Sequence, residues 1–127
     1  MGQSVSITSN QGYPDKGGNR TYTLILQERD WQMNIWMTEA ELAIIPNVKT
    51  ARWSKRTCLE IGTCQGIQTF WSCENDCLSI LVGDPEGWNF GIMIARAEIE
   101  NIITEIEHQK KSEDDYFRQR ACCSFFV

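Results

Sequence analysis

The amino-acid sequence predicts an α+β fold, an antiparallel β-sheet meander of about six to seven strands with one long C-terminal amphipathic helix packed on one face. Three observations lead to this prediction. Apolar and polar residues alternate between Thr57 and Ile94, in segments separated by turn residues. Isoleucines then recur at helical spacing within residues 95–110. The chain has 127 residues, which suits one domain, so we expect a single domain over residues 1–127.

The first third of the chain predicts strands and one long loop. Residues 3–8 alternate and indicate a short edge strand, whereas residues 10–19 are rich in glycine, proline and asparagine and indicate a loop. We therefore expect residues 1–20 to form a flexible N-terminal strand and loop. β-branched and aromatic residues predict a strand at 21–27, and a hairpin connection leads from it into a second strand at 31–37.

Residues 38–48 fit two structures. Thr38 followed three residues later by Glu41 is a capping-box pattern, which predicts a short helix that ends at Pro46. The same apolar residues would also fit a buried strand. The capping box favours the helix.

The alternation of apolar and polar residues between Thr57 and Ile94 predicts the strands of the meander. The segment Asp84-Pro85-Glu86-Gly87 interrupts it with the residues that a type I turn prefers, so we interpret this segment as a chain reversal. The strands are expected to point these side chains into the core: Leu59, Ile61, Ile67, Thr69, Trp71, Leu78, Ile80, Val82, Trp88, Phe90, Ile92 and Ile94.

The C-terminal part is predicted to be a helix followed by a tail. Ile99, Ile102, Ile103 and Ile106 form one apolar stripe, with glutamates on the opposite side of the helix. Residues 111–127 are expected to form a polar C-terminal tail with an apolar end.

Catalysis finds little support in the residue types. The chain has one histidine, His108, on the expected polar side of the helix, and it has no Gly-x-Ser-x-Gly sequence. A general base or an activated nucleophile would have to recruit this one imidazole. We therefore expect no enzyme and no catalytic residues.

The cysteines do not predict a metal site or a cofactor. Cys58, Cys64, Cys73 and Cys77 are spaced C-x5-C-x8-C-x3-C, whereas structural zinc sites favour short spacings at both ends of the ligand set. In the expected meander the first pair flanks one tip and the second pair flanks another. Strand thiols are the favoured interpretation, with a disulfide between Cys73 and Cys77 under oxidation as a minor alternative.

The hydropathy and the N-terminus bear on location. No apolar run approaches the roughly 18 residues that cross a bilayer, and the N-terminus lacks the basic and apolar segments of a secretory signal. We expect a cytoplasmic protein with reduced thiols that does not bind membranes.

The charge distribution predicts a protein partner. The net charge is −5, which argues against nucleic acid as a ligand, and residues 60–107 contain nine acids but a single base, Arg96. We expect this acidic band to bind a basic protein through surface complementarity, as immunity proteins against nuclease-like toxins or inhibitors of defence enzymes would. The expected contact residues are Glu74, Asp76, Asp84, Glu86, Trp36 and Trp53, because exposed tryptophan is enriched at binding hot spots.

Three other interpretations stay open. Trp36 and Trp53 would suit a small-molecule or sugar-binding module if they line one cleft. The apolar end at residues 121–127 would suit a structural subunit that docks on a neighbour in a larger assembly. The glutamates of the acidic band would alternatively do no more than solvate the outer side of the helix.

Overall fold

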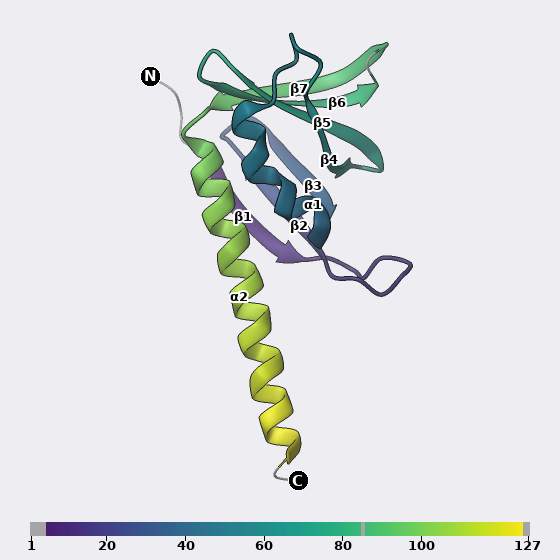
Figure 1. The fold of residues 1–127 in the computed structure, drawn as a ribbon, viewed down its shortest axis with the longest axis vertical. Coiled ribbons are helices and arrows are strands. Elements are labelled where there is room, and N and C mark those ends of the chain that lie inside the picture. Colours follow the sequence, from purple (N-terminus) through teal and green to yellow (C-terminus); the bar gives the residue numbers. More distant parts are fainter. Residues whose placement is uncertain (1–4, 85, 126–127) are drawn as a thin grey trace.

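The computed structural model describes residues 5–84 and 86–125, with side chains described as far as Lys111. Within this part of the chain, the strands form one seven-stranded antiparallel sheet in the order of the sequence, and helices follow the third and the last strand (Figure 1). The predicted α+β meander is therefore confirmed. The elements are β1 (Ser6–Gln11), β2 (Thr21–Gln27), β3 (Gln32–Thr38), α1 (Glu39–Ile44), the 3-10 helix η1 (Ile45–Thr50), β4 (Leu59–Cys64), β5 (Ile67–Glu74), β6 (Cys77–Asp84), β7 (Gly87–Ala95) and α2 (Glu98–Phe125).

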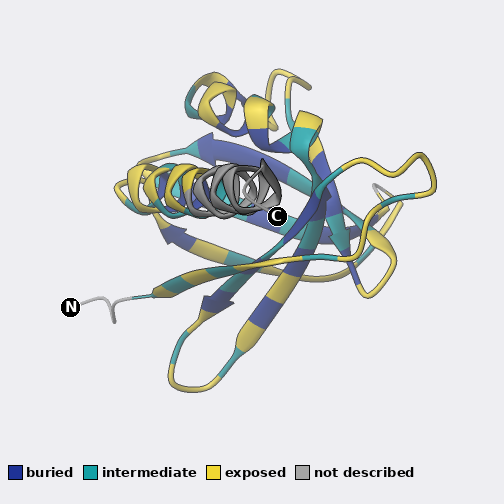
Figure 2. Ribbon diagram, turned by 90° about the horizontal axis from the view of Figure 1, so that it is seen from below, coloured by how far each residue is buried: buried dark blue, intermediate teal, exposed yellow. Residues whose placement is uncertain are grey.

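One face of the sheet, here called the inner face, forms the hydrophobic core together with the helices. Alternate residues of each central strand point into it, and Figure 2 shows buried segments along the strands and exposed ones in the loops. The opposite, outer face carries the other residues of each strand. The fully buried side chains include Trp71, Tyr22, Leu24, Leu26, Met33, Ile35, Met37, Ile61, Leu78 and Ile80.

Helix α2 packs beside β1 through the predicted isoleucine stripe. Ile99, Ile102 and Ile106 are buried, and the Ser9 hydroxyl of β1 donates a hydrogen bond of 2.7 Å to Glu105 on α2. This hydrogen bond and the stripe fix the start of α2 against the N-terminal edge of the sheet.

The backbone of α2 is longer than the predicted 95–110, since it continues to Phe125 and past the sheet (Figure 1). Residues 112–125 contain no glycine or proline, so their composition does not end the helix. The polar tail expected at 111–127 stays a prediction, and its backbone is helical as far as Phe125. The side chains at 121–127, on which the assembly interpretation rests, lie outside the described residues.

The helical prediction for residues 38–48 is confirmed. The Thr38 hydroxyl accepts from the backbone N–H of Glu41 at 3.2 Å, and the Glu41 carboxylate accepts from the backbone N–H of Thr38 at 3.0 Å. This reciprocal pair is the capping box that the sequence indicated. Pro46 lies in the first turn of η1, where a missing backbone N–H is tolerated.

Two irregularities in the strand register shape the outer face. Between Glu60 and Thr63 the β4–β5 pairing shifts, and Gly62 adopts φ +73° close to the Trp36 carbonyl. The β6–β7 pairing shifts because Val82 pairs with Phe90 whereas Gly83 pairs with Trp88, which leaves Asn89 as an extra residue in β7. A shift of one residue changes the face on which the following side chains lie.

Candidate binding site on the outer face

Three aromatic side chains gather on the outer face of β5 and β7. The Trp88 ring meets the rings of Trp53 and Phe70 edge to face, each at a centroid distance of 5.3 Å. Phe70 precedes the fully buried Trp71 in β5, and alternation therefore places it on the outer face. We call Trp53, Phe70 and Trp88 the aromatic cluster. Such edge-to-face pairs contribute about 0.5–1.5 kcal/mol each beyond the area they bury.

Hydrogen bonds to backbone groups hold the loop that carries Trp53 against the end of β5. The N–H of Cys73 donates to the Ala51 carbonyl at 2.9 Å. The Arg52 guanidinium donates to the carbonyls of Lys49 and Ala51, at 3.0 and 3.1 Å, and it also donates to the carbonyl of Cys73. Because its guanidinium is engaged in this way, Arg52 positions the loop.

Glu74 fixes the same loop from the β5–β6 turn. Its carboxylate accepts from the backbone N–H of Ser54 at 3.0 Å. This hydrogen bond is the main reason that the pKa of Glu74 lies below its ordinary value. Glu74 was a predicted partner contact, and the structure gives it a local role beside Trp53.

The loop and the strand border a surface hollow of about 550 Å³ beside the aromatic cluster. Its lining consists of Trp53, Ser54, Arg56, Cys58 and Phe70. Burial raises the pKa of the Cys58 thiol above its ordinary value. The thiol is therefore protonated at neutral pH, and the hollow suits recognition better than nucleophilic chemistry.

Exposed charges surround the aromatic cluster, with opposite signs on different sides. Glu60 lies directly opposite Phe70 in the β4–β5 pair. Asp84 and Glu86 lie in the turn that leads into Trp88, and the Asp84 carboxylate accepts from the Glu86 N–H at 2.8 Å, a bond that stabilises the turn. On the loop side the exposed charges are positive and belong to Lys55 and Arg56.

The structure divides the predicted acidic contacts into two groups. Glu74 and Asp76 lie at the β5–β6 turn, whereas Asp84 and Glu86 lie at the β6–β7 turn. Strand β6 has eight residues, and at a rise of about 3.3 Å it separates the two turns by roughly 23 Å. The predicted acids therefore form two patches and not one continuous surface.

The two predicted tryptophans are also separated. Trp53 is 41% exposed and lines the hollow. Trp36 is half-buried in β3, pairs with Thr63 and lies against Gly12, and it does not line the hollow. The expectation that both rings line one cleft was therefore wrong for this hollow, because the loop places Trp53 over β5 and β7.

Sequence reasoning missed two members of the cluster. Trp88 was expected in the core, and this was wrong because the register shift at Gly83 moves its side chain to the outer face. Phe70 carried a usable signal, since it is a large apolar residue in the outward phase of its strand.

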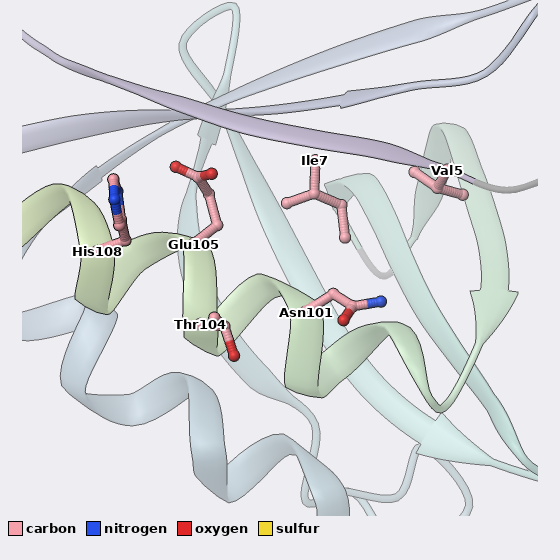
Figure 3. Close-up of a pocket in the computed structure, with 6 residues that line it drawn as sticks. All are labelled: Val5, Ile7, Asn101, Thr104, Glu105 and His108. Atoms are coloured by element: carbon pink, nitrogen blue, oxygen red, sulfur yellow. The ribbon is translucent and has the colours of Figure 1, made fainter.

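A second hollow, of about 470 Å³, lies between β1 and α2 and includes His108 (Figure 3). Ile7 and Asn101 contribute to its lining from the two elements. The Glu105 carboxylate in this hollow is already bound by the Ser9 hydroxyl, so it is part of the contact between helix and sheet. We assign no reaction to this hollow.

Cys58 and Cys64 do not flank one tip of the meander, although the sequence had indicated that they would. Cys58 precedes β4 and Cys64 ends it, so the two do not flank one tip. Cys73 pairs with Leu78 on the inner face, whereas Cys77 pairs with Glu74 on the outer face, and this geometry disfavours a disulfide between them. All four are free thiols, and among the described residues no group of cysteine, histidine and carboxylate side chains is arranged to hold a metal ion.

Comparison of the chain with protein-family models, curated proteins and solved structures finds no match. Among the described residues, no helix is long and apolar enough to span a membrane.

Proposed function

We propose that the protein is a protein-binding module that contacts its partner through the outer face of β4–β7. The observation that carries this proposal is Trp53, which remains 41% exposed although its ring is held in place by Trp88. A rigid, partly exposed aromatic side chain next to a hollow is the usual form of an interface hot spot, because it buries a large area at little cost in conformational entropy.

The charges around the cluster favour a partner with a mainly basic contact surface. Glu60 lies beside Phe70 on β4, Asp84 and Glu86 lie in the turn before Trp88, and the chain has a net charge of −5. Arg56 lines the hollow and would meet an acidic or carbonyl group of the partner. Such complementarity speeds encounter and selects the partner, while the aromatic side chains provide most of the affinity. An inhibitor of a basic enzyme, which acts by covering its surface, fits this arrangement.

Affinity capture with matched variants tests the proposal. Immobilised wild-type protein and the Trp53→Ala and Trp36→Ala variants are exposed to the same cell lysate, and retained proteins are quantified by mass spectrometry. We expect a basic protein that the wild type and Trp36→Ala retain and that Trp53→Ala loses, because Trp36 lies outside the hollow. Equal retention by both variants would exclude the aromatic cluster as the binding surface.

Salt provides the second part of this test. At 500 mM salt the Debye length shortens to roughly 4 Å, so capture that depends on Glu60, Asp84 and Glu86 should fall strongly relative to 50 mM. If capture depends on Trp53 but not on salt, the aromatic cluster remains the proposed binding surface and the proposal of a basic partner is rejected.

A small-molecule ligand is the second candidate, and the hollow itself supports it. Its volume of about 550 Å³ and its aromatic lining are within the range of small-molecule sites. Tryptophan fluorescence measured against a panel of oligosaccharides tests this candidate. A saturable change that Trp53→Ala abolishes would support it, and an unchanged spectrum across the panel would reject a sugar ligand.

A further inference from the structure

The loop that carries Trp53 also holds Arg56 at a fixed place beside it. The N–H of Arg56 donates to the Trp53 carbonyl at 3.0 Å. The next N–H, of Thr57, donates to the Arg52 carbonyl at 2.9 Å, and the N–H of Arg52 donates in return to the Thr57 hydroxyl at 2.8 Å. These bonds close the loop, so the side chains of Trp53 and Arg56 leave it at the two ends of one turn, and both line the hollow.

Arg56 adopts a backbone conformation that arginine rarely takes. Its φ is +54°, in the left-handed region that favours glycine. The other non-glycine residues with a positive φ in the described part of the chain lie in two-residue hairpin turns, which require it; they are Gln65, Asn75 and Asp76. Arg56 lies between η1 and β4, outside any such turn. An arginine at a position that glycine would fit better indicates a role for its side chain.

The Arg56 guanidinium is available to a ligand. Arg52 in the same loop donates from its guanidinium to backbone carbonyls, whereas no ion pair or side-chain hydrogen bond engages that of Arg56 among the described residues. Of the side chains that line the hollow, Arg56 alone is charged. The hollow therefore presents one cation next to the rings of Trp53 and Phe70.

The remaining hydrogen-bond donors favour a side-chain carboxylate as the ligand group. Sites for phosphate or for the carboxylate at the end of a chain are usually built from several free backbone N–H groups. In this loop the N–H of each residue in 54–57 already has an acceptor within the protein. The guanidinium is left, and its planar fork matches one carboxylate through two parallel hydrogen bonds.

We propose that the hollow binds a segment of the partner protein in which an aspartate or glutamate lies next to an aromatic side chain. The aromatic ring packs on Trp53 and Phe70, and the carboxylate accepts two hydrogen bonds from Arg56. This inference rests on the proposed function, since it takes the aromatic cluster as the binding surface, and it adds the chemical group that this surface recognises. The acids beside the aromatic cluster contact basic groups elsewhere on the same partner.

Short peptides test this chemistry without the partner. The probes are acetyl-Ala-Glu-Phe-Ala-amide and a neutral match with Gln in place of Glu, each titrated into the full chain while the indole N–H resonances are followed by NMR. We expect the Glu peptide to bind about tenfold more tightly, because a charged acceptor strengthens the hydrogen bonds to Arg56. The resonance that shifts should be the one that Trp53→Phe removes. A third peptide, acetyl-Ala-Gln-Phe with a free terminal carboxylate, should bind no better than the neutral one.

The variant Arg56→Gly separates recognition from stability. Glycine accommodates the positive φ, so this variant should unfold at a urea concentration no lower than that of the wild type. It should nevertheless bind the Glu and Gln peptides equally. The matched control Lys55→Gln removes the same charge from an exposed residue of the same loop that does not line the hollow. It should keep the preference for the Glu peptide within about twofold, because salt at about 150 mM screens a charge that makes no contact.

Several results would overturn the inference. Equal affinities of the Glu and Gln peptides for the wild type would do so, as would a preference lost to the same extent in Lys55→Gln. Tighter binding of the peptide with the free terminal carboxylate, or no binding of the Glu peptide up to about 5 mM, would also contradict it. The proposed function has a separate readout, which is the loss of the captured protein in Trp53→Ala. If that loss occurs while the peptides show no preference, the binding surface stands and carboxylate recognition by Arg56 is rejected.

Discussion

The carboxylate of Glu41 connects helix α1 to the irregular part of β4, and its removal should destabilise the fold. In addition to the capping box with Thr38, Glu41 accepts a hydrogen bond of 2.6 Å from the backbone N–H of Gly62. Both hydrogen bonds are part-buried, so water replaces the carboxylate poorly. The substitution Glu41→Ala leaves the N–H groups of Thr38 and Gly62 without this acceptor.

The expected cost follows from these hydrogen bonds. Loss of the reciprocal cap costs about 1 kcal/mol. Loss of a hydrogen bond to a charged acceptor adds about 1.5–3 kcal/mol. We therefore expect Glu41→Ala to lower the free energy of unfolding by about 3 kcal/mol, measured by urea denaturation with circular dichroism and tryptophan fluorescence.

Glu39→Ala is the matched control in the same helical turn. Glu39 makes one exposed ion pair with Lys110, at 3.9 Å, which is worth less than about 1 kcal/mol. If Glu41→Ala also costs less than 1 kcal/mol, the hydrogen bond to Gly62 does not contribute as described and the reasoning is refuted.

Three further substitutions or reactions test local features. Gly62→Ala should destabilise the protein by about 2–4 kcal/mol, because φ is +73° and the new Cβ would lie 2.7 Å from the Trp36 carbonyl; urea denaturation within 1 kcal/mol of the wild type would contradict this. The folded pKa of Glu74 lies below its ordinary value of 4.5, so its bond to Ser54 contributes stability above that pH and is lost as the pH falls through the folded pKa. The protection of the Ser54 amide against hydrogen exchange, relative to an unprotected amide at the same pH, should therefore fall on acidification in the wild type. Glu74→Gln already lacks the charged acceptor, so its Ser54 protection should not fall in this way. Because burial and Glu60 raise the pKa of Cys58, iodoacetamide at pH 8 should modify it more slowly than an unhindered cysteine, and peptide mapping should show a faster reaction in Glu60→Gln. Equal rates in the wild type and Glu60→Gln would show that the carboxylate does not act on the thiol.

Local sequence patterns were sufficient for most of the fold. The capping box at Thr38 and Glu41 depends on residues three apart, and the stripe of Ile99, Ile102 and Ile106 depends on helical spacing alone. The turn after Asp84 likewise needs only neighbouring residues. Each of these features depends on residues that are close together in the sequence, and a sequence pattern can therefore predict it.

The candidate site depended on contacts that no local pattern contains. Trp88 lies outside the core because of a one-residue register shift at Gly83. Trp53 contacts Trp88 because Arg52 and Glu74 hold the loop of Trp53 against the end of β5. The separation of the acidic turns likewise follows from the length of β6 once the meander is formed. Sequence reasoning therefore found Trp53 but not its neighbours.

Hydrogen exchange of the complex tests the central claim, that the outer-face aromatic cluster binds a partner, most directly. The protein is compared free and bound to the protein that the wild type captures, and exchange is read by mass spectrometry along the chain. The account predicts new protection in residues 52–58, 68–70 and 86–90, which surround Trp53 and Trp88. Protection confined to β1 and the adjacent part of α2, with none at these three segments, would contradict it.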